Sequence, residues 1–365
     1  YEIVDCDWSS DVCSSDLKVT PGLRDELLAA VMDTALSKLT PSEMFTDDAD
    51  ARIAEIERKE LGRVERAEWY ERFAYIQDDE SYFDLRDRRE ISRQSFNALY
   101  RHIACYSIHQ SGNGKRRIEA SVCFDENRQA MGAKALVGIT YAAGESVLVT
   151  RDGDVFGNRW RDARPEVDKD APVGDISLWL DHCATLVPEQ SELNHLFDIM
   201  AFKVQHPEIK INHAVLHAGD EGSGKDTFWA PFIWAVCGPH LKNRGIMDNN
   251  SINSQWGYQL ESEILLINEL KEPDAATRRQ LANQLKPIIA APPETLPINR
   301  KGLHPYQMAN RLFVLAFSND PVPISLASQD RRWFAIWSTA ARMDPSVAQK
   351  IWKWYRAGEI GRAHV

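Results

Sequence analysis

Cysteine is scarce in the sequence and long apolar runs are missing, and each absence narrows the class of protein. Outside the first 17 residues there are only Cys105, Cys123, Cys183 and Cys237, which form no CxxC pair and no Cys/His cluster. These spacings exclude the patterns of a disulfide framework and of a zinc site. No apolar run approaches the ~20 residues that span a bilayer. We therefore expect a soluble, cytoplasmic protein with no membrane partner.

The two ends of the chain lack the periodicity of folded elements. "DWSSDVCSSDL", Asp7 to Leu17, has no apolar period of two or of 3.6, and no Lys or Arg precedes it as in a secretory leader. A DNA string that resembles a common sequencing adaptor encodes it completely. The reverse complement of the same adaptor encodes "IGRAHV", Ile360 to Val365. We therefore predict that residues 1–17 and 359–365 are non-native and unpacked.

Basic charge is in deficit. Residues 18–358 contain 42 Lys and Arg against 48 Asp and Glu, for a formal net charge of −6. The overall field of such a chain does not attract phosphate, so any contact with nucleic acid requires local basic patches. A length of about 340 residues also exceeds a single typical core, and two domains are the expectation.

The spacing of apolar residues changes along the chain. Residues 18–101 place apolar residues three and four apart among mixed charges, which predicts amphipathic helices. Residues 133–170 contain short β-branched runs broken by Gly and Asp-Gly, which predicts short strands. A helical pattern then returns and stops before Pro207. We place a boundary near Glu208, because the pattern differs after it.

A glycine-rich turn follows the apolar segment Ile211 to Leu216 and precedes a helix predicted to run to about Val236. The turn, Gly219 to Lys225, fits GxxxxGK. Its glycines let backbone N–H groups point inward at phosphate oxygens, Lys225 reaches the β/γ-phosphates, and the helix N-terminus adds partial positive charge. The predicted nucleotide-binding residues are Gly219, Asp220, Glu221, Gly222, Ser223, Gly224, Lys225, Asp226 and Thr227.

The motif departs from its usual form at one place. Asp226 follows the lysine, where Ser or Thr is expected to bind Mg²⁺, and Thr227 comes one residue later. Either Asp226 lies near the metal or Thr227 supplies the hydroxyl, and the sequence leaves both open. The predicted cofactors are ATP and Mg²⁺, with Asp226, Thr227 and Glu269 as candidate metal ligands.

Two later apolar strands end in polar residues. Ile264 to Ile267 leads into Asn268 and Glu269. P-loop ATPases place an acidic residue at such a strand end to hold Mg²⁺ or to orient the attacking water, which makes Glu269 the candidate base. Leu312 to Phe317 leads by way of Ser318 to Asn319, whose amide can hydrogen-bond the water or the γ-phosphate.

An arginine pair follows in "SQDRRWFAIW". Arg331 and Arg332 can supply a guanidinium that neutralises transition-state charge, usually across a subunit boundary. A salt bridge with Asp330 is the alternative role.

Between the two apolar strands, a Pro-rich segment contains "NRKG", Asn299 to Gly302, which predicts a β-hairpin. Arg300 and Lys301 near its tip are the candidate DNA-binding residues, because several copies of a basic tip in a ring could bind a single strand. A solvated turn is the simpler interpretation of this segment taken alone.

Together these motifs resemble the superfamily 3 helicases of viruses and phages, and most closely the helicase half of phage and plasmid primase-helicases, including the poxvirus type. The resemblance covers roughly Glu208 to Arg342. It implies an AAA+-like ATPase that assembles as a ring, a hexamer, and moves along single-stranded DNA during replication. It also implies a primase domain or protein upstream and, for a phage-encoded chain, the host cytoplasm.

The resemblance assigns roles to the catalytic candidates. Lys225 would bind the β/γ-phosphates, Glu269 would activate water and Asn319 would sense the γ-phosphate. Arg331 or Arg332 would act on a neighbour's ATP, and Lys301 with Arg300 would contact DNA.

The predicted fold is α/β: a P-loop NTPase core with an AAA+-like parallel sheet, preceded by a mainly helical accessory domain with a few short strands. The predicted parts are residues 18–207 (accessory), 208–342 (ATPase) and 343–358 (C-terminal helix), in which Trp352, Trp354 and Tyr355 pack on the core. Two alternatives remain open: a P-loop nucleotide or small-molecule kinase, favoured by the Lys-Asp-Thr ending, and an inactive ATP-binding module.

Overall fold

The computed structural model describes residues 68–107, 116–165, 174–248, 257–268, 270, 275–300, 304–326 and 330–356. Contacts divide the chain into two units, Tyr1–Phe73 with Arg93–Lys134, and Ala74–Ser92 with Ala135–Val365. Residues 1–17 and 359–365 lie outside the described residues, as do the helices expected in residues 18–67. The non-native character of the two ends therefore stays a prediction.

Aromatic side chains form the core of the first unit. Its elements are short: α3 (Arg93–Leu99), α4 (Ala120–Asn127) and the antiparallel pair β4 (Cys105–Tyr106) and β5 (Arg117–Ile118). The rings that meet between them are those of Trp69, Tyr70, Phe73, Phe96, Tyr100 and Phe124. Large aromatic residues bury much apolar area per residue, which suits a unit built from such short elements.

Short strands occupy the part of the second unit that precedes its helices. β1 (Phe73–Ile76), which leads from one unit into the other, joins β2 (Ser81–Asp84), β3 (Arg89–Ile91) and β6 (Ala135–Leu136) in the order β3-β2-β1-β6. A second sheet has the order β7-β9-β8 and consists of β7 (Gly138–Thr140), β8 (Leu148–Arg151) and β9 (Asp154–Asn158). The short strands predicted in residues 133–170 are confirmed.

The prediction of helices throughout residues 18–101 is wrong for residues 73–91. Residues 68–72 are helical, but "FAYI" and "SYFD" then form β1 and β2. Glu80 takes a φ of 46° in the turn between them. Aromatic side chains pack well on the buried face of a sheet. In this segment their burial outweighs the helical spacing of apolar residues in the sequence.

The helical pattern before Pro207 forms two helices, α5 (Ser177–Leu186) and α6 (Gln190–Gln205). The break falls at Pro188, which has no N–H to donate to a continuing helix. The apolar faces of both helices join α7 (Lys225–Cys237) in one buried cluster, which includes Leu186, Leu196 and Phe228. The boundary that we predict near Glu208 falls between α6 and the next strand, inside the second unit.

A five-stranded parallel sheet is the centre of the second unit, and it confirms the predicted fold class. Its strands are β11 (Arg244–Met247), β12 (Ile264–Ile267), β15 (Phe313–Ser318), β10 (Ala214–Gly219) and β16 (Trp333–Ser338), in this spatial order. β12 has its predicted bounds, whereas β10 begins three residues later than predicted and β15 one residue later.

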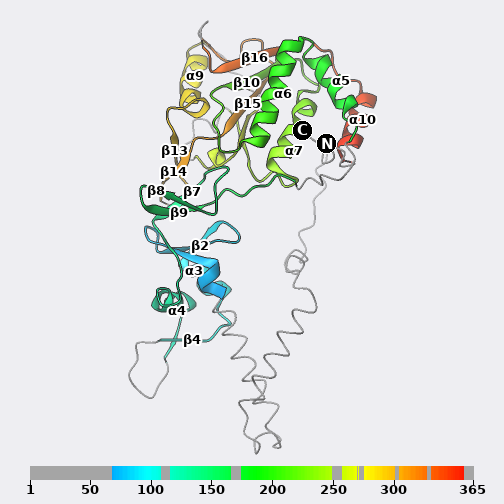
Figure 1. Cartoon of the computed structure of the whole chain (residues 1–365). Coiled ribbons are helices and arrows are strands. Elements are labelled where there is room, and N and C mark those ends of the chain that lie inside the picture. The colour runs from blue at the N-terminus through cyan, green and yellow to red at the C-terminus, as the bar shows by residue number, and fades with distance from the viewer. Residues whose placement is uncertain are drawn as a thin grey trace, which may run out of the picture. The chain divides into compact units, whose positions relative to one another are not determined.

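Helices cover both faces of this sheet. Figure 1 shows α6 and α7 on one side and α9 (Ala275–Ile289) on the other. Val215 and Leu315 face the α7 cluster, whereas Leu216 and Val314 face the α9 cluster, with the period of two that strands require. Every residue of β10, β12 and β15 is buried. This explains why they read as continuous apolar runs rather than alternating ones.

The predicted hairpin is confirmed by the antiparallel pair β13 (Thr295–Ile298) and β14 (Tyr306–Ala309). Lys301, the basic residue expected at its tip, lies outside the described residues. β14 lies against β7: Thr140 Oγ1 donates to the Gln307 carbonyl at 3.1 Å, and Ala309 N donates to the Tyr141 carbonyl at 3.1 Å. The short accessory strands therefore support the hairpin.

The last helix, α10 (Pro345–Arg356), only partly follows its prediction. Ile351 is its buried residue, Trp352 is exposed, and Trp354 and Tyr355 are half-buried. The expectation that Trp352 packs on the core is wrong, because the face carrying Ile351 turns inward. A short 3₁₀ turn, η2 (Tyr258–Leu260), completes the elements. Among the residues that the structure describes, none of the helices has the length and apolar character to cross a membrane.

A buried carboxylate connects the accessory segment to the sheet. Glu263, which has 0% exposure, precedes β12. It accepts hydrogen bonds from Arg164 Nη2 at 2.7 Å, Trp160 Nε1 at 2.7 Å and Asn243 Nδ2 at 3.1 Å. A buried charge of this kind is tolerated only when it is paired and fully hydrogen-bonded.

Glu263→Gln is expected to destabilise the second unit by about 3–5 kcal/mol, because it removes the buried counter-charge of the Arg164 guanidinium and leaves only its ion pair with the exposed Asp162 at 3.1 Å. Urea unfolding followed by tryptophan fluorescence measures the loss. Glu208→Gln is the matched control: its carboxylate pairs with His206 at the surface, and less than about 1 kcal/mol is expected. Equal losses in the two variants would contradict the structural role of Glu263.

Candidate phosphate-binding site

The glycine-rich turn after β10 and Asn319 after β15 lie at one edge of the sheet. In the parallel register Ala218 pairs with Ser318, and Gly219 pairs with Ser338. The carboxyl ends of β10, β15 and β16 are therefore level, and the segments that follow them start side by side. This edge is where open α/β sheets bind ligands.

The glycine-rich turn has the backbone conformation of a phosphate cradle. Gly222 has a φ of 77° and Gly224 a φ of 99°, which L side chains rarely adopt. A Cβ atom at Gly224 would also lie 2.7 Å from His182 Cε1 and would clash with Met343. α7 begins directly after this glycine, and no side chain caps its N-terminus. Its first N–H groups and its dipole therefore suit an anion.

Lys225 lies at the centre of the turn. Its Nζ donates to the Gly219 carbonyl at 2.7 Å, the Asp220 carbonyl at 2.8 Å and Asn319 Oδ1 at 2.9 Å. An ammonium has three donors, and all three are used. Burial lowers the pKa of Lys225, and the negative charges of nearby Asp226, Asp220 and Glu221 oppose that shift.

Asn319 lies beside Lys225, at the end of an apolar strand as the sequence predicts. It follows β15, which lies between β10 and β12, and its amide oxygen accepts the hydrogen bond from Lys225. The rest of the side chain is exposed at the same edge. Two residues that are 94 positions apart in the sequence thus meet in one site.

Exposure distinguishes the two candidate metal ligands that follow Lys225. Asp226 is exposed in the first turn of α7, whereas Thr227 is buried, with 7% exposure. Of the two, the carboxylate is open to a hydrated cation. Within the described ranges no group of three or more His, Cys, Asp or Glu side chains forms a metal cluster. Magnesium ordinarily takes one or two carboxylates together with substrate phosphates.

Glu269 lies outside the described residues, but both of its chain neighbours are placed. Asn268 N donates to the Met247 carbonyl at 3.0 Å, and Leu270 N donates to the Phe317 carbonyl at 2.8 Å. Ser318 Oγ in turn donates to the Leu270 carbonyl at 2.7 Å. The carboxyl end of β12 is thereby held beside that of β15, one strand away from the turn.

The arginine pair lies at the other end of the sheet. Ala214 N donates to the Arg332 carbonyl, so both arginines sit at the amino end of β16. The six residues of β10 separate them from the turn by roughly 17 Å at ~3.3 Å per residue. Arg332 pairs with Asp330 at 3.5 Å, as in the alternative role, whereas the exposed Arg331 has no partner among the described residues.

Arg300 is engaged at the base of the hairpin. Its Nε lies 3.7 Å from Glu261 Oε1, and the same carboxylate accepts from Tyr306 and pairs with Arg159 at 3.1 Å. Only 23% of the Arg300 side chain is exposed. Much of its charge is therefore neutralised within the chain before any DNA contact.

Three residues that sequence reasoning did not single out line the turn. His182 Nε2 lies 3.0 Å from the Gly224 carbonyl, and since a carbonyl only accepts, this nitrogen carries the proton. Burial lowers the His182 pKa. Met343 N donates to the Gly222 carbonyl at 2.9 Å, and Arg342 lies against the same glycine. No local motif marks these residues, because α5 and the segment after β16 reach the turn only through the fold.

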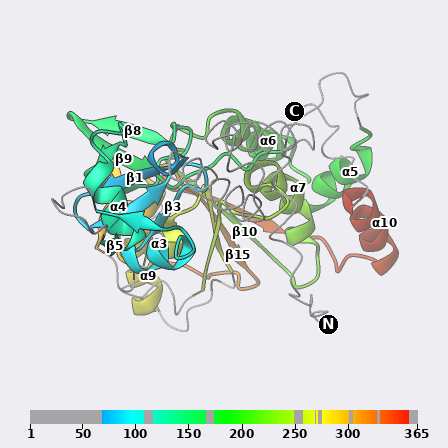
Figure 2. The same cartoon turned by 90° about the horizontal axis from the view of Figure 1, so that it is seen from below.

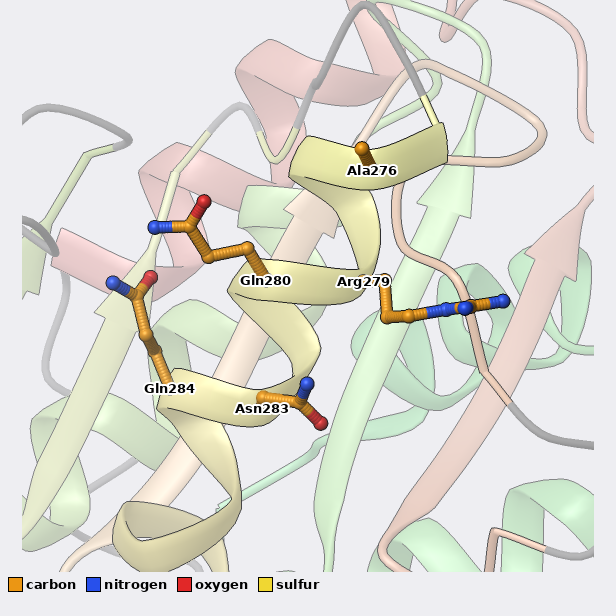
Figure 3. Close-up of a pocket in the computed structure, with 5 residues that line it drawn as sticks. All are labelled: Ala276, Arg279, Gln280, Asn283 and Gln284. Carbon is orange, nitrogen blue, oxygen red and sulfur yellow. The ribbon is translucent and has the colours of Figure 1, made fainter.

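A separate hollow of about 770 Å³ lies on α9. Figure 3 shows the described residues that line it, Ala276, Arg279, Gln280, Asn283 and Gln284, all on this helix. None of these residues contacts Lys225 by a hydrogen bond that the structure shows.

One family comparison matches the segment that contains the turn and Asn319. The pattern of a family of unknown function, DUF5906, matches residues 217–332, which begin within β10 and end before β16. A DNA primase-polymerase of Nitratiruptor phage NrS-1 is 28% identical over 138 residues, which cover 38% of this chain and 18% of the phage protein. The chain thus aligns with less than a fifth of that relative.

Solved structures support the fold. The apo structure of the NrS-1 C-terminal region matches with a TM-score of 0.61 at 17% identity, covering 80% of this chain and 66% of that one. A second apo form of the same region gives a TM-score of 0.59 at 18% identity, with 80% and 64% covered. At these identities the likeness concerns the fold alone.

Gly224→Ala is expected to destabilise the chain more than Gly153→Ala. Both glycines have a positive φ, 99° and 92°, but a Cβ at Gly153 meets nothing within 4 Å. We expect about 1–2 kcal/mol from the backbone at Gly153, and about 1–3 kcal/mol more at Gly224 from overpacking against His182 and Met343. Urea unfolding of both variants checks the difference. Equal costs would mean that α5 and the segment after β16 do not pack on the turn.

Proposed function

We propose that this chain is a Mg²⁺-dependent ATPase that couples hydrolysis to movement on single-stranded DNA, as a replicative helicase. The observation that carries the proposal is the position of Lys225. Its ammonium is held by loop carbonyls and by Asn319, at the carboxyl edge of a parallel sheet and beside an uncapped helix N-terminus. This combination suits a triphosphate and a group that responds to its terminal phosphate.

The residues of the turn would exchange partners on binding ATP. The Lys225 ammonium would leave the Gly219 and Asp220 carbonyls for β- and γ-phosphate oxygens, which are stronger acceptors. Release of the Lys225 bond would free Asn319 Oδ1 to hold the attacking water or its amide to hold the γ-phosphate. Without ligand, the hydrogen bonds of Lys225 would be made within the protein, and with ATP bound they would be made to phosphate. This exchange would need no large backbone movement.

Glu269 and Asp226 supply the remaining chemistry of the proposal. Glu269 follows β12, and β15 separates β12 from β10, so a carboxylate there can take a proton from water on the Asn319 side of the phosphates. Asp226 is the group we assign to the metal, directly or through water, because its carboxylate is exposed whereas Thr227 is buried. Bound Mg²⁺ would neutralise charge that develops on the phosphates.

The position of Arg331 supports a ring. This arginine is exposed at the amino end of β16 and lies too far from the Lys225 of its own chain to touch the same nucleotide. A second copy could present it to that nucleotide. Arg332 is paired with Asp330, so Arg331 is the residue we assign to the neighbour's ATP. A closed assembly, a hexamer in this proposal, gives every site such a neighbour.

The DNA contact is assigned to the hairpin and its tip. Lys301 would bind the strand, while Arg300 is held at the base of the hairpin by Glu261. The similarity to a phage DNA primase-polymerase favours replication as the setting, with the priming activity in a part of the protein or a partner upstream. On this proposal the protein acts in the cytoplasm of a phage host.

Lys225→Ala is expected to lower the ATP hydrolysis rate at least about 100-fold, because it removes the cation that binds the β/γ-phosphates. Phosphate release measured with and without single-stranded DNA checks this, and DNA should stimulate the wild-type rate. Lys242→Ala removes an exposed lysine outside the site and is the matched control. Phosphate transfer to an acceptor with no response to DNA would support the kinase instead. Absence of turnover in the wild type would support the inactive module.

Arg331→Ala is expected to reduce hydrolysis about 10³-fold or more if it completes a neighbour's site. Mixing it in equal amounts with the inactive Lys225→Ala chain should restore about a quarter of the wild-type rate, because that share of interfaces then combines an intact lysine with an intact arginine. Arg332→Ala should retain more activity than Arg331→Ala. No recovery on mixing would place Arg331 outside the neighbour's site.

A further inference from the structure

Arg342 lies directly against the glycine-rich turn of its own chain. A Cβ atom at Gly222 would lie 3.1 Å from Arg342 Cγ and 3.2 Å from its Nε. The next residue is anchored there, since Met343 N donates to the Gly222 carbonyl at 2.9 Å. Arg342 is exposed, and within the described part of the chain its guanidinium has no hydrogen-bond or ion-pair partner.

Arg342 lies in the segment between β16 and α10, which together with α5 and α10 borders one side of the turn. α5 and α10 lie side by side in both views (Figures 1 and 2), and Trp354 Nε1 donates to the Asp175 carbonyl at 2.7 Å. His182 of α5 contacts Gly224, and Met343, just before α10, contacts Gly222. Both helices contact α7, and the Arg342 segment follows β16, whereas Asn319 approaches the turn from β15 on the other side of β10.

We propose that Arg342 binds the α- and β-phosphates of the nucleotide in the site of its own chain, opposite Asn319. The inference rests on the proposed ATPase function and adds a residue that neither the motifs nor the comparisons assign.

The charge of the site supports this assignment. A nucleotide triphosphate brings about four negative charges at neutral pH, and Lys225 supplies one positive charge. Among the described residues no carboxylate forms an ion pair with Arg342, and the Asp344 carboxylate accepts from Ser346 N at 2.7 Å. A free guanidinium against a loop backbone can bind two phosphate oxygens at once.

The strand order decides which phosphates Arg342 reaches. Asn319 follows β15, and β12, which Glu269 follows, lies beyond it, so the γ-phosphate must point toward that side for hydrolysis. The remaining phosphates and the nucleoside then extend toward the β16 side, from which the Arg342 segment reaches Gly222. Its contact would persist in ADP, in contrast to a contact made only to the γ-phosphate.

Arg342→Ala in the full chain tests this inference by titration calorimetry with Mg-ATP and Mg-ADP. We expect both affinities to fall about tenfold, as for loss of a charge-assisted hydrogen bond. The hydrolysis rate at saturating ATP should change less than the affinity. Arg342→Lys should restore part of the binding. Lys353→Ala, which removes an exposed cation from α10, should bind both nucleotides like the wild type.

The outcomes are separable. Normal ADP affinity of Arg342→Ala would overturn the inference while leaving the ATPase proposal intact, and loss of ATP affinity alone would place the contact at the γ-phosphate. A wild-type chain that binds neither nucleotide would refute the proposed function and this inference together. Unchanged thermal unfolding of Arg342→Ala shows that the effect is on binding, and Gly222→Ala, which pushes Arg342 away, should weaken ADP in the same way.

Discussion

The hydrogen bond from Lys225 to Asn319 is the contact on which the organisation of the site depends. It joins the glycine-rich turn after β10 to the end of β15. It can form only because β15 is inserted between β10 and β12, with Ala218 and Ser318 in register. A shift of either strand would separate the cation from the amide. The buried sheet therefore does more than support the turn, because its register sets which side chains meet there.

The accessory strands and helices position two elements of the same unit. Glu263 binds Arg164 and Trp160 to the sheet, and the strands β7 to β9 carry the hairpin β13–β14. α5 reaches the turn through His182. The buried network around Glu263 resists rearrangement, because breaking one of its hydrogen bonds would leave a buried polar group without a partner in a low dielectric.

Four arginines of the second unit differ in their partners. Among the residues that the structure describes, Arg342 at the turn and Arg331 at the opposite end of the sheet have no ion-pair partner, whereas Arg332 and Arg300 are paired with acids. Their sequence contexts do not differ in an obvious way, and all four are arginines near polar turns. The arginines differ in the partner that the fold provides. An arginine that already forms an ion pair with a carboxylate binds a phosphate less favourably, because that ion pair must first be broken.

The sequence by itself determined the local elements: the turn with Lys225, the apolar runs of β12 and β15 and the helix after the turn, because glycine spacing and unbroken apolar runs act over short distances. It misassigned residues 73–91, where aromatic burial outweighed helical spacing. Only the tertiary structure decided that Asn319 meets Lys225, that Asp226 is open while Thr227 is buried, and that Arg342 rather than Arg331 lies at the chain's own turn. Those facts follow from strand order and register, which link residues roughly 100 positions apart and leave no local pattern.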